Sequence, residues 1–463
     1  MASKSKKAVA LLLTAMMAAA AMAGCGDSSA PATTVTSTTA TESGEEELTV
    51  INLDDDEVLT TIKNKMKEEA DAQTGDKKGK VSLKVWCAST DLAFEQSLAK
   101  EFEEKFADSG YELKIRVSGA IGEDASGSKI IEGPEDGADV FNFADDQLSS
   151  LVEAGDIAPV AGYFLGNVKS ENTEDSIDIC TVNDEVYAYP KTSDNGYFLY
   201  YDKRFFDESD VADFDAMVSK AGQSGKSVFF DMGNGWYSTG FFFTAGCTVS
   251  YKDGKQTATY NSDEGLSAAK AMCHIAENTG NGFEGTPGTM GDNAYVKAGF
   301  EDGSLVAAVI GTWVGPDIKA AIGEENVGAA KLPTVLMDGE QKQLDSFGGY
   351  KLIGVNKFST YSFSSQVLAY YLGCPDSQLK RYQTRGLIAT STKALEDDKL
   401  KADPALLAIE AQKPYAHAQG ASVSGKYWAS NIGGFGGEIV TEKGKLTDDQ
   451  LKTKLKQIED QMS

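Results

Sequence analysis

Three of the four tryptophans in this chain have the side-chain chemistry and the surroundings of ligand contacts. They are Trp236 in Asn-Gly-Trp-Tyr, Trp313 in Gly-Thr-Trp-Val-Gly and Trp428 in Gly-Lys-Tyr-Trp, all glycine-rich or turn-rich segments. A flat, rigid ring near a loop can stack on the apolar face of a sugar ring. A carboxylate at a strand end can accept strong hydrogen bonds from sugar hydroxyls. A tryptophan considered alone usually packs in a core, so ligand contact and core packing both stay open.

Motifs of nucleotide, serine and metal enzymes are absent or incomplete. Gly-Lys-Ser at 225–227 resembles the end of a phosphate loop, but Lys220 stands where that motif needs glycine. The glycine-rich run at 433–437 lacks the last glycine of a dinucleotide loop, and GxSxG and HExxH do not occur. The chain has only two histidines, His274 and His417, and histidine is the commonest general base. We therefore expect no catalytic residue, no metal site and no cofactor.

The N-terminus has the pattern of a secretory signal. Three lysines within the first seven residues precede an apolar stretch at 8–23, which is shorter than the roughly 20 residues that span a bilayer as a helix. It ends in Met-Ala-Gly-Cys, which resembles a bacterial lipobox. We expect residues 1–24 to be a lipoprotein signal peptide and Cys25 to carry a lipid that anchors the protein to the extracellular face of the cell membrane. An ordinary signal peptide or a short membrane anchor is the alternative.

Composition indicates a large acidic protein with two domains or lobes. The chain has 463 residues, 41% of them hydrophobic, and a net charge of −27 that becomes −30 without the three N-terminal lysines. Such a charge repels nucleic acid, so no nucleic-acid partner is expected. Apart from Cys25, five cysteines lie far apart with no CxxC pair. This spacing indicates neither a zinc site nor a disulfide framework, although one bridge remains possible.

Strands and helices alternate along the body of the chain. Residues 26–47 have the composition of a flexible tether. Helical spacing of apolar residues within 48–80 predicts a helix either on this tether or packed on the body. Alternation at 81–85, a four-residue apolar period at 94–106 and alternation at 111–117 predict a βαβ unit in a parallel sheet. The next predicted strand, 139–143, leads into a helix that Asp145 caps and Gly155 ends.

Further elements of both kinds follow. Strands are predicted at 186–189, 197–201, 228–231, 305–310 and 350–355. Helices are predicted at 213–221, 265–277, 364–372 and 404–411, and a last helix carries Leu451, Leu455, Ile458 and Met462 on one face. The alternation predicts an α/β fold.

Several segments in a fixed order carry a family resemblance. They are Val-Ser-Leu-Lys-Val-Trp at 81–86 with the helix after it, Gly-Ala-Asp-Val-Phe at 137–141, Leu-Val-Glu-Ala-Gly-Asp-Ile-Ala-Pro at 151–159, Asn-Asp-Glu-Val-Tyr-Ala-Tyr-Pro at 183–190, and 298–303 continuing to Thr-Trp at 312–313. Together they resemble the extracellular solute-binding proteins of ABC importers (family 1), in particular the maltose/maltodextrin-binding branch. No single segment is unique, but the ordered set is specific.

The resemblance implies a two-lobed periplasmic-binding-protein-like fold of type II. Residues 81–192 plus 350–385 would form lobe 1, and residues 193–349 plus 386–463 would form lobe 2, with residues 25–80 as a tether that holds the possible helix. The chain would cross between the lobes near Thr192, near 347–349 and near Gly386.

Lobe 1 is expected to supply mainly polar contacts to a ligand. By position in the motifs, Asp146 matches the family's sugar-binding aspartate and Phe143 its nearby aromatic. Thr90 and Asp91 match a loop that offers polar contacts. Asp91 and Gln147 stand where the maltose binder has basic residues, so the pattern that reads sugar hydroxyls differs.

Lobe 2 and the hinge are expected to supply the aromatic contacts. Trp313 and Trp428 match the two tryptophans that stack on sugar rings. Asn234 and Trp236 match an acid and an aromatic, with an amide replacing the acid. Asp194 matches an acidic contact beside the hinge.

The resemblance implies a receptor that captures maltose, maltodextrin or another oligosaccharide and delivers it to the permease subunits of an ABC transporter, with no reaction. Three alternatives stay open. A secreted glycoside hydrolase would also use aromatics, with two carboxylates about 5–9.5 Å apart. A binder of a nonsugar solute could have the same fold, and a purely structural surface protein would bind neither.

Overall fold

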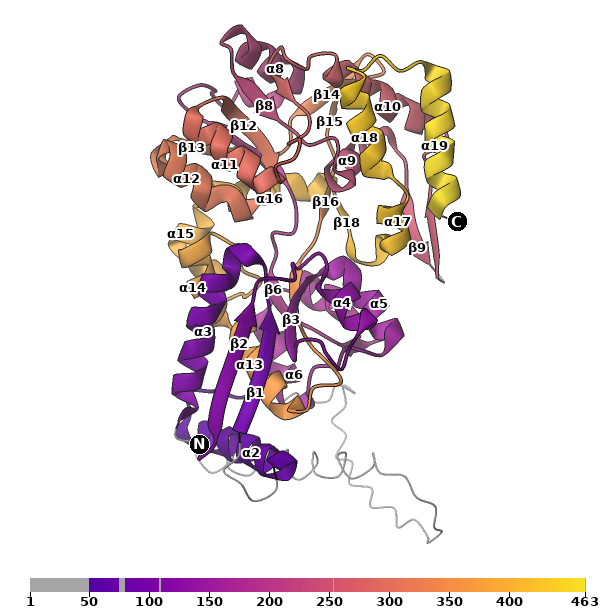
Figure 1. The fold of residues 1–463 in the computed structure, drawn as a ribbon. Coiled ribbons are helices and arrows are strands. Elements are labelled where there is room, and N and C mark those ends of the chain that lie inside the picture. Colours follow the sequence, from indigo (N-terminus) through magenta and orange to yellow (C-terminus); the bar gives the residue numbers. More distant parts are fainter. Residues whose placement is uncertain (1–49, 75–79, 108–109, 253, 463) are drawn as a thin grey trace, which may run out of the picture.

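Two lobes, each built on a five-stranded sheet, make up the described chain (Figure 1). The computed structural model describes residues 50–74, 80–107, 110–252 and 254–462, so Cys25 and the predicted signal peptide lie outside the described residues. Within these ranges no helix combines the length and the apolar character that a membrane crossing needs. The five cysteines that they contain are free thiols. Mixed sheets with helices packed on them confirm the predicted α/β class.

The sheet of lobe 1 contains the predicted βαβ unit. Its strands in spatial order are β2 (Glu112–Ser118), β1 (Lys80–Trp86), β3 (Val140–Ala144), β17 (Lys351–Val355) and β6 (Tyr189–Thr192). Strand β1 runs parallel to β2, with Val81 opposite Leu113, and α3 (Leu92–Lys105) connects the two strands. Phe94, Leu98 and Phe102 form the buried face of α3, as their four-residue spacing predicts. Strand β17 returns late in the sequence and pairs antiparallel with β3 and β6.

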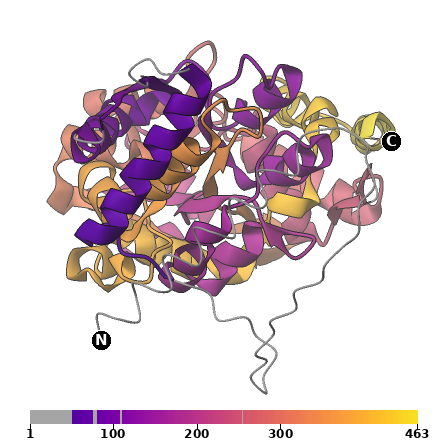
Figure 2. The same ribbon diagram turned by 90° about the horizontal axis from the view of Figure 1, so that it is seen from below.

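The helix predicted within 48–80 packs on lobe 1. It is α2 (Asp56–Thr74), and its Ile62, Met66 and Ala70 are fully buried in the core of this lobe. The carboxylate of Glu69 accepts hydrogen bonds from the first backbone N–H groups of α13 (Ser362–Gly373). Figures 1 and 2 both show the N-terminal elements beside the orange segment that returns to lobe 1. Residues 56–74 are therefore part of the folded body, which corrects the tether interpretation for this stretch.

Other helices complete lobe 1. They are α4 (Ser126–Glu132), α5 (Leu148–Ala154), α6 (Gly162–Glu171), α7 (Glu174–Ile179) and α14 (Pro375–Arg385). Gly155 ends α5 in a left-handed conformation with φ of 76°, as expected of a C-terminal glycine. Asp145 does not cap this helix, contrary to the prediction. It begins a 3₁₀ turn, and its buried carboxyl faces Asn195 in the segment between the lobes, so it is not available to the helix N–H groups.

The sheet of lobe 2 is centred on strand β12. Its strands in spatial order are β11 (Phe283–Glu284), β8 (Ser227–Phe229), β12 (Leu305–Ile310), β7 (Phe198–Asp202) and β13 (Val327–Ala330). All six residues of β12 are buried, which explains why this strand is a continuous apolar run without alternation. Smaller sheets pair β4 (Thr181–Val182) with β5 (Glu185–Val186), β9 (Val249–Lys252) with β10 (Lys255–Ala258), β14 (Thr334–Met337) with β15 (Glu340–Gln343), and β16 (Ser346–Gly348) with β18 (Ala416–Ala418).

Helices surround the sheet of lobe 2 (Figure 1). They are α8 (Phe214–Gln223), α9 (Gly235–Ala245), α10 (Asp263–Ala276), α11 (Asp292–Asp302), α12 (Gly315–Ile322), α15 (Asp398–Lys401), α16 (Pro404–Gln412), α17 (Gly425–Ala429), α18 (Ile432–Thr441) and α19 (Asp448–Met462). Helix α9 was not predicted from the sequence. The four apolar residues predicted on one face of α19 are buried, as expected.

Three segments connect the lobes, between β6 and β7, between β16 and β17, and after α14. They are hydrogen-bonded to one another, because the backbone N–H of Asn195 donates to Gly349 and that of Ser193 donates to Ile388. Gly386 ends α14 in a left-handed conformation. The three connections therefore form one narrow waist between the lobes, and this waist lies beside the cavity described next.

Candidate functional site

A cavity of about 680 Å³ lies between the two lobes. Its volume falls within the roughly 300–1,000 Å³ that is usual for small-molecule sites. Lobe 1 borders it with the loops at 88–91 and 122–124 and with Asp146. Lobe 2 borders it with Asn234, Asp292 and the three tryptophans singled out from the sequence. Eight of the nine expected ligand contacts line this single cavity, although they come from segments as far apart as residues 90 and 428.

The three tryptophans are half-buried on the lobe 2 side of the cavity. Trp236 stands in the first turn of α9, Trp313 in a 3₁₀ turn after β12, and Trp428 on α17. The ring centroids of Trp236 and Trp313 are 5.9 Å apart with planes inclined by 44°. A Cβ atom on Gly311 would meet the Trp313 ring at 2.0 Å, so the glycine two residues before Trp313 lets this ring lie close to the backbone.

Each indole N–H of these tryptophans already has a protein acceptor. Trp236 Nε1 donates to Gln419 Oε1 at 2.7 Å. Trp313 Nε1 donates to Asn293 Oδ1 at 2.9 Å, and Trp428 Nε1 lies 3.4 Å from Asp146 Oδ2. The ring faces, and not the N–H groups, are therefore left for a ligand.

Asp146 is the carboxylate of lobe 1 that is best placed to meet a ligand. Its Oδ2 accepts from Trp428, whereas its Oδ1 has no hydrogen-bond partner among the described residues. Burial raises the pKa of Asp146, although Gln419, Lys351 and Trp428 act in the opposite direction. Burial and the charge of Asp146 also raise the pKa of the neighbouring Asp145 to about 7. A buried carboxylate oxygen without a partner favours a ligand that can donate a hydrogen bond.

Two other expected contacts line the cavity with their carboxylates already engaged. Oδ2 of Asp194 accepts from the Thr312 hydroxyl and from the backbone N–H of Ile388. These two hydrogen bonds connect the first connecting segment, which contains Asp194, to lobe 2 and to the third connecting segment. The Asp91 carboxylate pairs with Lys191 and Arg385, whereas Ser89 and Thr90 of the same loop are exposed and line the cavity.

Phe143, also expected at the site, lies elsewhere. It is fully buried in the core of lobe 1, where its ring centroid is 5.3 Å from that of Phe141, and it does not line the cavity. All five residues of β3 are buried. The aromatic ligand contact that the resemblance implied at this position is therefore not found, because the whole strand is buried.

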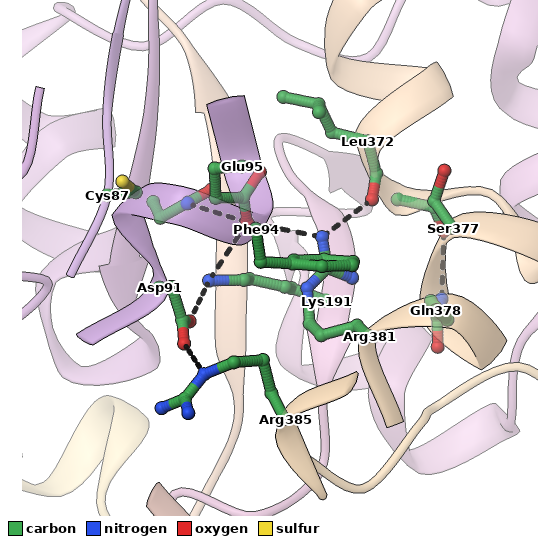
Figure 3. A network of polar contacts seen from close by, with 12 residues as sticks. Cys87, Asp91, Phe94, Glu95, Lys191, Leu372, Ser377, Gln378, Arg381 and Arg385 are labelled. Carbon is green, nitrogen blue, oxygen red and sulfur yellow. Dashed lines mark hydrogen bonds and ion pairs between the residues drawn. The ribbon is translucent and has the colours of Figure 1, made fainter. Parts of the chain in front are cut away.

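A buried ion network that the sequence did not suggest borders the cavity through Asp91, Glu123 and Lys191. Figure 3 shows Lys191 in this network with Asp91, Glu95 and two arginines. Lys191 Nζ is 2.6 Å from Glu123, 3.3 Å from Asp91 and 3.5 Å from Glu95. Burial lowers the pKa of Lys191, but the three carboxylates outweigh it and raise the pKa overall. Two arginines of α14 extend the network, Arg381 towards Glu95 and Arg385 towards Asp91. The network joins the cavity loops of lobe 1 to the ends of two connecting segments.

A carboxyl pair without a cation lies on the lobe 2 side. Asp231 follows β8 and is 5% exposed, and Asp292 opens α11 on the cavity wall. Asp231 and Asp292 affect each other's pKa through a side-chain hydrogen bond, and no cation of the described residues contributes to either pKa. Burial and the charge of Asp292 raise the pKa of Asp231 to about 8. We therefore expect the pair to hold a proton at neutral pH.

This pair predicts a pH-dependent effect of Asp231→Asn on stability. A carboxyl whose pKa is higher in the folded state contributes stability at acid pH that is lost as the pH rises towards the folded pKa. The amide of asparagine has nearly the same shape as the carboxyl group of Asp231 but does not titrate. We expect the melting temperatures of variant and wild type to match near pH 4 and the variant to become more stable towards pH 8, by about 2–4 °C per kcal/mol gained.

Calorimetric or fluorescence-detected melting across this pH range checks the effect. Asp317→Asn is the matched control, because Asp317 is exposed and paired with Lys297. Its effect should be small and should not grow with pH. A constant difference between Asp231→Asn and wild type from pH 4 to 8 would contradict the shared proton.

Comparison with known proteins agrees with this architecture. A solved structure with acarbose is 29% identical with a TM-score of 0.72, and the match covers 83% of this chain and 99% of that one. The maltodextrin-binding protein MalE1 from L. casei BL23 is 23% identical (TM-score 0.67, 83% and 99% covered). The maltotriose-binding protein of Thermus thermophilus, bound with maltotriose, is 19% identical (TM-score 0.67, 82% and 98% covered). These likenesses show that the chain shares the fold of these structures.

No curated protein matches the chain. The sequence does match a family model. Residues 97–408 match the model of the bacterial extracellular solute-binding proteins, which is more than half of the chain. The protein therefore belongs to the bacterial extracellular solute-binding proteins.

Proposed function

We propose that this protein is a lipid-anchored receptor that captures an oligosaccharide, such as maltose or a maltodextrin, and hands it to the permease of an ABC importer. The observation that carries the proposal is the convergence of three half-buried indoles on one interlobe cavity with their N–H groups already bonded. Ring faces presented in this way suit the apolar faces of sugar rings. Acarbose and maltotriose in the similar structures add support.

Ligand capture is proposed to proceed by closure of the two lobes. Asp146 approaches the ligand from lobe 1 and the tryptophans approach it from lobe 2. A saccharide that touches both gains contacts only when the lobes are close together, so it shifts the population towards the closed form. The permease would recognise that form, and no bond of the sugar is made or broken.

Asn234 is proposed to act through Trp236. Its side-chain oxygen accepts the backbone N–H of Trp236 and caps α9, so this oxygen is occupied at the position where, by the resemblance, the maltose binder has a carboxylate. The position that reads a sugar hydroxyl on this wall has changed, and the natural ligand is accordingly left at the level of an oligosaccharide.

Titration calorimetry with maltotriose and a panel of glycans tests the proposal. We expect saturable binding of at least one saccharide at millimolar concentration or below. A parallel panel of peptides, amino acids and polyamines should give no shift of the melting temperature, since only a bound ligand stabilises the fold. If the protein bound only a nonsugar solute, the proposed carbohydrate ligand would be wrong, whereas the proposed role as a solute receptor would still hold.

The membrane anchor rests on the N-terminal pattern and on Cys25. Residues 25–49 would connect the lipid to the start of the folded body, where Asn167 holds both backbone polar groups of Ile51. Labelling of producing cells with a palmitate analogue checks the anchor. We expect label in the wild type and none in Cys25→Ser, which should be released into the medium. Equal labelling of both proteins would contradict lipidation at this residue.

A further inference from the structure

Gln419 is a buried polar residue that contacts both halves of the site. It directly follows β18, and only 4% of its surface is exposed. Its side-chain oxygen accepts the indole N–H of Trp236 at 2.7 Å. Its backbone N–H donates at 3.2 Å to the carbonyl of Gly348, the last residue of β16, after which the second connecting segment begins. Nothing in the sequence around Ala-Gln-Gly singled it out.

The chemistry of the amide determines what its other end does. A glutamine side chain has one acceptor oxygen and one NH₂ donor group. The oxygen is bonded to Trp236, so the NH₂ group is the end that acts on Asp146, where Gln419 lowers the pKa of the carboxyl against the effect of burial. Asp146 in turn accepts from Trp428. A chain of four side chains, Trp236, Gln419, Asp146 and Trp428, therefore passes from lobe 2 to lobe 1 and back along the cavity.

We propose that Gln419 is a positioning residue of the ligand site, which fixes the ring of Trp236 and keeps Asp146 ready to accept a ligand hydroxyl. This inference rests on the proposed function. A glutamine is suited to the task because it can serve a donor and an acceptor at the same time. An apolar residue would leave the indole N–H of Trp236 without its acceptor and Asp146 without the amide donor, and lost hydrogen bonds are costly for buried groups. A carboxylate at this position could accept the hydrogen bond of Trp236, but its negative charge would repel that of Asp146.

Two substitutions of Gln419 distinguish its effect on Trp236 from its effect on Asp146, and ligand affinity is the quantity that is measured. Gln419→Leu should weaken binding of maltotriose, or of the best glycan of the panel, about tenfold at every pH. Gln419→Glu should weaken it at pH 8, where two carboxylates face each other, and should approach wild type near pH 5, where a shared proton restores a donor. Each variant is compared with wild type at the same pH. A merely structural role would give no such recovery on acidification.

Gln366→Leu is the matched control. Gln366 is also a buried glutamine whose oxygen accepts from an aromatic side chain, Tyr189, but it lies in lobe 1 and does not line the cavity. Its replacement should lower the melting temperature and leave affinity unchanged. The inference is overturned if both Gln419 variants bind like wild type across the pH range, or if Gln366→Leu weakens binding as much as Gln419→Leu.

A ligand-free readout keeps the inference separate from the proposed function. The four tryptophans of the full chain give four indole N–H signals in a ¹⁵N spectrum, which Trp→Phe variants assign. Gln419→Leu should move the signals of Trp236 and Trp428 and leave that of Trp86 in place. Unmoved signals would overturn the inference. A wild-type protein that binds no glycan would refute the proposed function, while this spectrum would still decide whether Gln419 positions Trp236.

Discussion

Replacing Lys191 by methionine is expected to lower the free energy of unfolding by about 3–5 kcal/mol, the usual effect of removing one partner from a buried ion pair. Lys191 is 1% exposed and is the cation shared by Asp91, Glu95 and Glu123. Without it, Glu123 keeps only Lys351 at 3.9 Å, and three carboxylates lie close together away from water. Because two of them line the cavity, ligand affinity should fall as well.

Urea or thermal unfolding of both proteins measures this loss, and its pH dependence has a defined sign. Burial raises the pKa of Asp91, but Lys191 and Arg385 hold it below its ordinary value. Such a lowered pKa contributes stability above the unfolded pKa that is lost as the pH falls through the folded pKa. The difference between wild type and Lys191→Met should therefore be largest near neutral pH and should shrink below about pH 4.

Lys380→Met provides the comparison for this variant. Lys380 also pairs with a glutamate of lobe 1, Glu101, but both side chains are exposed. Surface pairs of this kind contribute about 0–1 kcal/mol. Equal destabilisation by the two substitutions would contradict the role assigned to the buried network.

Replacing Trp313 by alanine is expected to weaken saccharide binding by about 1–3 kcal/mol, by analogy with the stacking of nucleic-acid bases on aromatic side chains. That corresponds to about 5- to 150-fold in the dissociation constant. Trp313 is held by Asn293 through its indole N–H and lies beside Trp236, so its ring is fixed before the ligand arrives. Trp313→Phe should lose less of the saccharide affinity than Trp313→Ala, because the smaller phenyl ring can still stack on a sugar ring.

Calorimetric titrations of the folded variants check this expectation. Trp86→Phe is the control, since Trp86 ends β1 and does not line the cavity. Its affinity should equal that of wild type. An unchanged affinity in Trp313→Ala would reject the stacking role, whatever the other tryptophans contribute.

Local periodicity was sufficient to predict much of the fold. The βαβ unit of lobe 1 follows from alternation and from the four-residue spacing of Phe94, Leu98 and Phe102. Helix α9 was missed because it is apolar on nearly all sides, with Phe241, Phe242 and Phe243 all buried. A helix surrounded by core has no polar face to produce a period. Asn234 caps this helix, but an asparagine can be recognised as a cap only when the helix that follows it is already known.

The site could be predicted only in part. The tryptophans were recognisable because they are few and stand in glycine-rich or turn-rich segments. The ion network was not, because Lys191 lies 68 residues from Glu123 and 100 from Asp91, and no local pattern connects such positions. Gln419 was equally hidden, since a lone glutamine in a loop has no sequence signature. Phe143 shows the reverse error, in which a position implied by resemblance is occupied by a core residue.

A crystal structure of the protein with maltotriose tests the central claim most directly. The account predicts sugar rings in the interlobe cavity against the faces of Trp236, Trp313 and Trp428, with a hydroxyl donating to Asp146 Oδ1. The indole N–H groups should remain bonded to Gln419, Asn293 and Asp146. A saccharide bound outside this cavity, or held by indole N–H groups that have turned away from their protein acceptors, would contradict it.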